Sequence, residues 1–66
     1  MAPKNKNLSA KELTALEDQL GIEQNLTNKY NFYAQNCQDA NLKKKIEDVA
    51  KKHQEHFDAL TPYLEN

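Results

Sequence analysis

The sequence predicts an all-α fold, an antiparallel helical hairpin with helices at about residues 10–37 and 40–60. One reason is composition: the 66 residues include one Gly and two Pro, which leaves little material for strands and tight turns. The common residues Leu, Glu, Lys, Gln and Ala are good helix formers. The other reason is periodicity, because apolar residues recur at alternating spacings of three and four in both segments, as they do in packed helices.

The first helix is expected to begin after Ser9, because Ser9 and Glu12 have the spacing of a capping box. Residues 1–8, which precede it, are expected to form a flexible tail. A stripe at helical spacing then follows one face of the helix. It consists of Leu13, Leu16, Leu20, Glu23, Thr27, Tyr30, Ala34 and Cys37.

The second helix is expected to begin after Asp39, which is a good N-cap. Thr61-Pro62 is either its stop signal or the start of one final turn with Pro at the first position. The connection before Asp39 is short, so the two helices must be antiparallel neighbours. The stripe on the second helix consists of Leu42, Ile46, Val49, His53, His56, Leu60 and Tyr63.

The register of the hairpin follows from pairing the two stripes outward from the turn. Tyr30 then lies opposite Val49, and Glu23 lies opposite His56. His53 falls one turn away from His56. The three polar residues that interrupt the stripes are therefore expected to meet at one level.

Apolar residues beside the stripes make each face wider than one partner helix can cover. They are Ile22, Leu26 and Tyr33 on the first helix, and Ala50, Phe57 and Leu64 on the second. A second hairpin would complete a four-helix bundle. Glu23 lies near the middle of the first helix, so a two-fold axis at mid-height would bring both sets of polar residues together. We therefore expect a homodimer with its two turns at opposite ends.

Glu23, His53 and His56 are the candidate site residues, because a buried carboxylate or imidazole is costly unless it is paired. Histidines three residues apart share a helix face and can reach one ion. Two His and one carboxylate suit Zn(II) or Fe(II). Three interpretations stay open. The three residues bind a metal, or they form a polar layer in which Glu23 hydrogen-bonds to His56 and to its dimer mate and fixes the register, or one of the two His points to solvent.

Charge and composition exclude several classes of function. A net charge of −1 without any Arg argues against a nucleic-acid partner, and no apolar run approaches a membrane span. The N-terminal segment lacks the apolar core of a signal peptide, and a single Cys gives no disulfide framework, so we expect a cytoplasmic location. The chain has no Ser–His–Asp group, phosphate-binding loop or CxxC pair, which makes an enzyme the less favoured expectation without deciding the matter.

The spacing of the polar and apolar residues also resembles a known family. The pattern Leu20-x-x-Glu23, followed by Asp39-x-x-Leu42 and His53-x-x-His56, is similar to half of a ferritin-like (rubrerythrin-type) bundle. The resemblance covers residues 12–64 and implies that residues 9–66 are half of a ferritin-like domain, with Glu23 and His56 at ligand positions. His53 replaces the bridging Glu of that family, and this difference weighs against di-iron oxidase or peroxidase chemistry.

The segment Ala50-Lys51-Lys52-His53-Gln54-Glu55-His56-Phe57 is similar to the short spore coat proteins of the Coat F type from spore-forming bacteria. That resemblance implies a structural or protective role in sporulation, with other spore coat proteins as partners and the spore coat as a location. The alternative is a small metal-dependent redox or peroxide-scavenging protein. A third possibility, a hairpin dimer that binds RNA, is disfavoured by the net charge.

Overall fold

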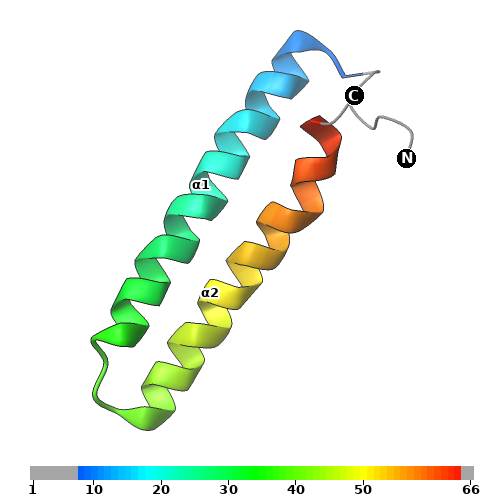
Figure 1. The fold of residues 1–66 in the computed structure, drawn as a ribbon. Coiled ribbons are helices and arrows are strands. Elements are labelled where there is room, and N and C mark those ends of the chain that lie inside the picture. Colours follow the sequence, from blue (N-terminus) through cyan, green and yellow to red (C-terminus); the bar gives the residue numbers. More distant parts are fainter. Residues whose placement is uncertain (1–7, 65–66) are drawn as a thin grey trace.

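The computed structural model describes residues 8–64, which form two antiparallel helices lying side by side (Figure 1). Helix α1 spans Ala10–Gln35, helix α2 spans Ala40–Leu60, and a short 3₁₀ helix, η1, spans Thr61–Leu64. The described residues contain no strand. The prediction of an all-α hairpin is therefore confirmed. Seven of the eight residues of the expected tail, and residues 65–66, lie outside the described residues.

Both predicted N-caps are confirmed. The backbone N–H of Glu12 donates to Ser9 Oγ at 3.1 Å, and the Ser9 N–H donates to Glu12 Oε1 at 2.9 Å, which closes the capping box. The Ser9 N–H, which donates to the carboxylate, is the main cause that lowers the pKa of Glu12, and a hydrogen bond from the Ser9 side chain adds to the lowering. At the start of α2, the Leu42 N–H donates to Asp39 Oδ1 at 2.8 Å. Each cap satisfies a backbone donor that the helix itself leaves without a partner.

The end of α1 differs slightly from the prediction, whereas α2 ends at Leu60 as predicted. Helix α1 stops at Gln35 rather than near Cys37, because the Asn36 side-chain amide donates to Phe32 O at 2.8 Å and closes the last turn. Cys37 therefore lies in the connection, where its Sγ is 3.5 Å from Asp39 O. Of the two alternatives for Thr61-Pro62, the final turn is the one observed, in the form of η1.

The packed face of α1 is the predicted one. Leu20, Glu23, Thr27 and Ala34 are buried. The other four members of the stripe, Leu13, Leu16, Tyr30 and Cys37, are half-buried.

The packed face of α2 is rotated relative to the prediction. Ala50 is its most buried residue, at 2 % exposure, and Ile46, His53, Phe57 and Leu60 are half-buried. Leu42, Val49, His56 and Tyr63 were expected in the packed stripe, but they are exposed, so the predicted stripe is wrong for these four. The predicted face and the observed packed face are adjacent on α2, and both contain apolar residues. The small Ala50 side chain is buried, whereas the bulkier Val49 is 39 % exposed.

The hairpin is a single layer of helices, with dimensions of 46 × 22 × 11 Å. Only three apolar residues among residues 8–64 are buried, namely Leu20, Ala34 and Ala50. A layer one helix thick leaves both of its broad faces in solvent. Few apolar contacts therefore hold α1 and α2 together, and the polar contacts between them gain importance.

We expect Asp39→Ala to lower the free energy of unfolding by about 1 kcal/mol, because it removes the side-chain acceptor for the first turn of α2. Urea denaturation followed by circular dichroism measures the change. Asp39→Asn keeps a capping side chain and should stay close to the wild type. Equal stability of the Ala variant and the wild type would show that this cap is not needed.

Candidate metal centre

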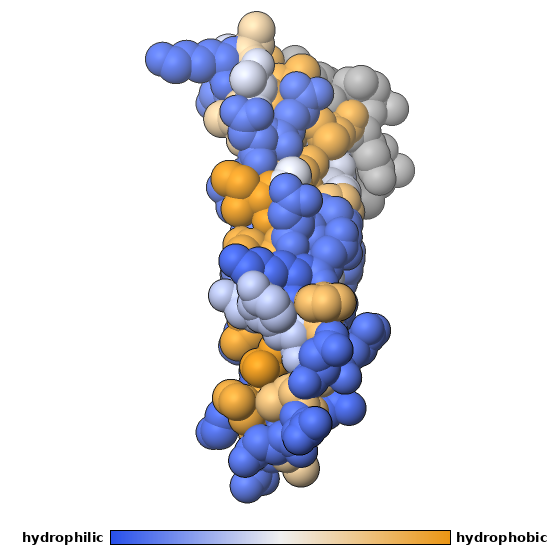
Figure 2. Space-filling view, turned by 90° about the vertical axis from the view of Figure 1, so that its left-hand side faces the viewer, coloured by the Kyte–Doolittle hydropathy of each residue, from blue (hydrophilic) through white to orange (hydrophobic). Residues whose placement is uncertain are grey.

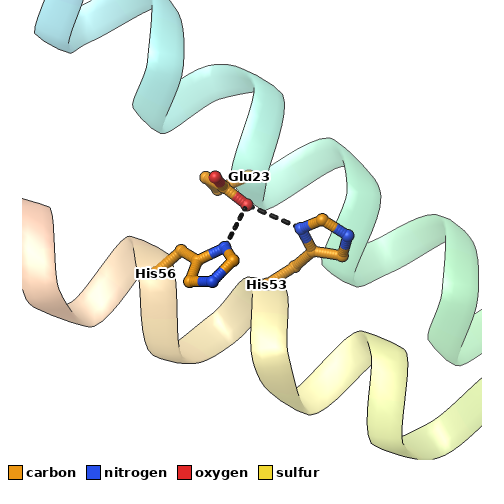
Figure 3. A group of neighbouring side chains, drawn as sticks. All are labelled: Glu23, His53 and His56. Carbon is orange, nitrogen blue, oxygen red and sulfur yellow. Dashed lines mark hydrogen bonds and ion pairs between the residues drawn. The ribbon is translucent and has the colours of Figure 1, made fainter.

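Glu23, His53 and His56 meet between the helices at mid-height of the hairpin. Glu23 projects from α1, and the two histidines, one turn apart on α2, direct their Nδ1 atoms toward its carboxylate (Figure 3). Glu23 Oε1 is 2.7 Å from His53 Nδ1 and 3.4 Å from His56 Nδ1. The predicted meeting of the three residues at one level is confirmed. The shorter contact is made by His53, because the rotation of α2 moves His56 from the packed face toward the edge.

Burial decreases steadily across the site. The Glu23 side chain is 9 % exposed, that of His53 is 24 % exposed, and that of His56 is 57 % exposed. Glu23 therefore lies at the closed side, against the helix interface. His56 marks the side that opens toward solvent, and an ion from solvent would enter there.

The Glu23 carboxylate has a hydrogen-bond partner on each of its oxygens. Gln19, one turn earlier on α1, donates from Nε2 to Oε2 at 3.0 Å, and His53 contacts Oε1. The Thr27 hydroxyl donates to the Glu23 backbone carbonyl at 2.9 Å. Gln19 was not identified from the sequence, although its position four residues before Glu23 places it on the same face. Because Gln19 holds Oε2, Oε1 is the oxygen turned toward the histidines.

Aromatic contacts fix the planes of the imidazole rings. The Tyr30 ring stacks on the His53 ring with centroids 6.0 Å apart and an interplanar angle of 9°. The two imidazoles are perpendicular, with centroids 5.6 Å apart. Tyr30 was predicted to be a core aromatic residue. It is half-buried, and its ring restricts how His53 can turn.

The contacts also determine the charge state of the carboxyl group. The hydrogen bond with His53 is the main cause that lowers the pKa of Glu23 below its ordinary value of 4.5. Desolvation by burial opposes this shift, while Gln19 and His56 add to the lowering. Glu23 is therefore a carboxylate at neutral pH. An ionised carboxylate is the form that binds a cation.

The arrangement fits the ligand set of a divalent ion. One ligand atom from each residue lies within 4.8 Å of the others, and no second group of this kind occurs among residues 8–64. Ligands of a tetrahedral Zn(II), with bonds of about 2.0–2.1 Å, lie about 3.3 Å apart. The 3.4 Å contact between His56 and Glu23 matches this spacing.

The 2.7 Å contact between His53 and Glu23 is a hydrogen bond and is shorter than the spacing of two metal ligands. An ion bound here would replace the proton between Nδ1 and Oε1 and would move the two atoms slightly apart. A neutral His53 that binds the ion through Nδ1 would then carry its one ring proton on Nε2.

Comparisons with protein-family models, with curated proteins and with solved structures found no match to this chain. Within residues 8–64, neither helix combines the length and the apolar character needed to cross a membrane. Support for a metal site therefore comes from the positions of Glu23, His53 and His56 in this structure.

The lowered pKa of Glu23 predicts how stability depends on pH. As the pH falls, the Glu23 carboxylate takes up a proton in the unfolded chain before it does so in the folded chain. Its contribution to the free energy of unfolding is therefore complete above about pH 4.5 and is lost as pH falls through the lower folded pKa. The difference in free energy of unfolding between the wild type and Glu23→Gln should therefore narrow between about pH 5.5 and about pH 3.

Urea denaturation of the wild type and of Glu23→Gln, carried out at about pH 5.5 and at about pH 3, measures this difference. Glu55→Gln, which removes an equal charge from the exposed face of α2, is the matched control. A difference between wild type and Glu23→Gln that stays constant over this range would contradict a stabilising role for the ionised carboxylate.

Proposed function

We propose that this chain is a small structural metal-binding protein that holds one Zn(II) or Fe(II) ion per hairpin through Glu23, His53 and His56. The supporting observation is that three ligand atoms from two helices lie within 4.8 Å of one another. An ion bound there would join α1 to α2 at mid-height. In a hairpin with few buried apolar residues, the free energy of binding would add directly to the stability of the fold.

The same proposal includes a homodimer with the architecture of a four-helix bundle. Its support is the apolar surface that one hairpin leaves exposed: Ile22 is 49 % exposed, Leu42 51 % and Val49 39 %. A second copy would cover this surface and give each helix a second neighbour. The ferritin-like architecture expected from the residue pattern is a bundle of this kind.

The residue pattern from Ala50 to Phe57 extends the proposal to a biological role. We assign the chain to the structural proteins of the spore coat, where it would act through assembly with itself and with other coat proteins. A metal-joined helical bundle suits such a role because it resists unfolding without needing a large core. Co-purification of the chain with isolated spore coats would test this assignment.

A second candidate function is metal-dependent redox chemistry, such as peroxide scavenging. The observation that favours it is the exposed His56 side of the site, because two His and one carboxylate leave open coordination positions on Fe(II). Peroxide consumption by the Fe(II)-loaded protein distinguishes this function from a purely structural one. His53 at the position of a bridging carboxylate favours the structural role.

Zn(II) should raise the melting temperature of the wild type, because an ion that binds only the folded chain stabilises it by about 2.7 kcal/mol at a free concentration a hundredfold above Kd. His53→Ala and His56→Ala should each remove most of this rise. Glu55→Gln, next to His56 but exposed, should keep it. A rise of equal size in both His variants would identify binding elsewhere and overturn the proposed site.

Sedimentation equilibrium should give twice the 7.6 kDa mass of the chain. Val49→Lys should shift the protein toward monomer, because it places a charge within the exposed apolar surface. Phe32→Lys is the matched control, since Phe32 is 61 % exposed and lies on the side of α1 opposite Glu23. A wild-type protein that sediments as a folded monomer would contradict the four-helix bundle.

A further inference from the structure

Charged side chains are divided unevenly between the two ends of the hairpin. The turn half, residues 24–53, has six lysines and three acidic residues, a formal charge of +3. The open half, residues 8–23 and 54–64, has one lysine and six acidic residues, a formal charge of −5. The boundary between the halves lies at the level of Glu23 and His53. The hairpin is therefore an electric dipole along its long axis, centred on the candidate site.

Four exposed apolar side chains, Ile22, Tyr33, Leu42 and Val49, and the half-buried Leu26 lie on one broad face of the hairpin, whereas the exposed Phe32 lies on the side of α1 opposite Glu23. At 100° per residue, Ile22, Leu26 and Tyr33 lie to one side of the packed stripe of α1, and Leu42 and Val49 lie to the corresponding side of that of α2. Antiparallel helices turn in opposite senses when seen from one end, so these two arcs are on the same face. We call the five residues the apolar face. Figure 2, which views the hairpin from the side of α1, shows orange patches along its left-hand margin and a further orange area at the upper right.

We propose that a second copy of the chain docks on the apolar face in a head-to-tail orientation, with its turn beside the open end of the first copy. This inference rests on the homodimer of the proposed function and specifies its geometry. Head-to-tail packing places the +3 half of each copy beside the −5 half of the other. Packing with both turns at one end would place like charges together at both ends. Charge complementarity of this kind selects orientation.

The orientation has a consequence for the candidate site. Glu23 lies at the middle of α1 (Ala10–Gln35), so a two-fold axis at mid-height brings the two sites to the same level. His56 lies on the side of α2 that belongs to the apolar face, and its side chain is 57 % exposed in the single hairpin. The second copy covers this open side of the site. Any effect of dimerisation on metal affinity is therefore matched by an equal effect of the metal on dimer affinity.

The first test measures the distance between the two turns. Cys37 is the single Cys of the chain, so a spin label there reports one position per copy. Over the 14 residues from Glu23 to Cys37, at about 1.5 Å per residue, the two labels in a head-to-tail dimer are about 40 Å apart. With both turns at one end, they would lie within about 20 Å. Pulsed electron paramagnetic resonance distinguishes these distances, and the short one overturns the inference.

A second distance measurement tests the same orientation with one label at the turn of one copy and one label at the open end of the other. One copy keeps its label at Cys37, and the other has Cys37→Ser combined with Ala10→Cys at the start of α1. Head-to-tail packing brings these two labels close together, whereas packing with both turns at one end separates them. A long distance in this mixed dimer overturns the inference.

The second test uses two variants whose charge changes have opposite signs. Lys51→Gln with Lys52→Gln makes the turn half less basic, and Glu47→Gln with Asp48→Asn makes it more basic; all four side chains are exposed on α2. In a head-to-tail dimer the lysine variant should raise the dimer Kd and the acidic variant should lower it, each by about fivefold at low ionic strength. Effects of the opposite signs overturn the inference.

Failure of this inference is distinguishable from failure of the metal site. A dimer with the expected label distances that binds no Zn(II) in calorimetry supports the orientation and overturns the metal proposal. A protein that binds one Zn(II) per chain but remains monomeric, or dimerises with both turns at one end, overturns the orientation and leaves the metal site intact.

Discussion

The contact between the Glu23 carboxylate and the two histidines is the interaction on which the rest of the structure depends. Glu23 is 7 % exposed, and a carboxylate that is withdrawn from water is costly unless it is paired with a hydrogen-bonding group. His53, at 2.7 Å, satisfies this charge from the opposite helix. The contact therefore fixes the register of α2 against α1 and the rotation of α2 that leaves His56 at the edge. An ion at this position would strengthen the same link between the helices.

The hairpin by itself buries few side chains among residues 8–64. Its core consists of Leu20, Ala34 and Ala50 together with the polar Glu23 and Thr27. The shortest dimension of the hairpin is 11 Å. Chains of this size often need a metal or a partner subunit in addition to their apolar core. In this chain the candidate metal ligands lie at the level of Glu23, and the two-fold axis of the proposed dimer crosses the same level. This arrangement agrees with the proposed function, a structural protein whose stability depends on assembly and on a bound ion.

The features that the sequence predicted correctly are local or periodic. The caps at Ser9 and Asp39 depend on residues three apart, and the stripe of α1 is set by helical spacing. The meeting of Glu23, His53 and His56 followed because a short connection permits only antiparallel pairing.

The features that it did not predict depend on side-chain size and on hydrogen bonds that spacing alone does not reveal. Val49 and Ala50 adjoin on α2, and periodicity accepts either one as the packed residue. The small Ala50 permits the closer approach of the helices, which rotates His53 toward Glu23 and His56 outward. The end of α1 depends on hydrogen bonds that the Asn36 backbone and side chain make to the last turn, and the Gln19 contact depends on which carboxylate oxygen faces inward.

The central claim is that Glu23, His53 and His56 bind a divalent ion, and nuclear magnetic resonance of the imidazole nitrogens during a Zn(II) titration tests it most directly. Multiple-bond proton–nitrogen correlation spectra report the state of each ring nitrogen. The geometry predicts that Nδ1 of both histidines becomes metal-bound together, with the change complete at one equivalent of Zn(II) per chain. Nitrogen signals of His53 and His56 that do not change at one equivalent would contradict the claim.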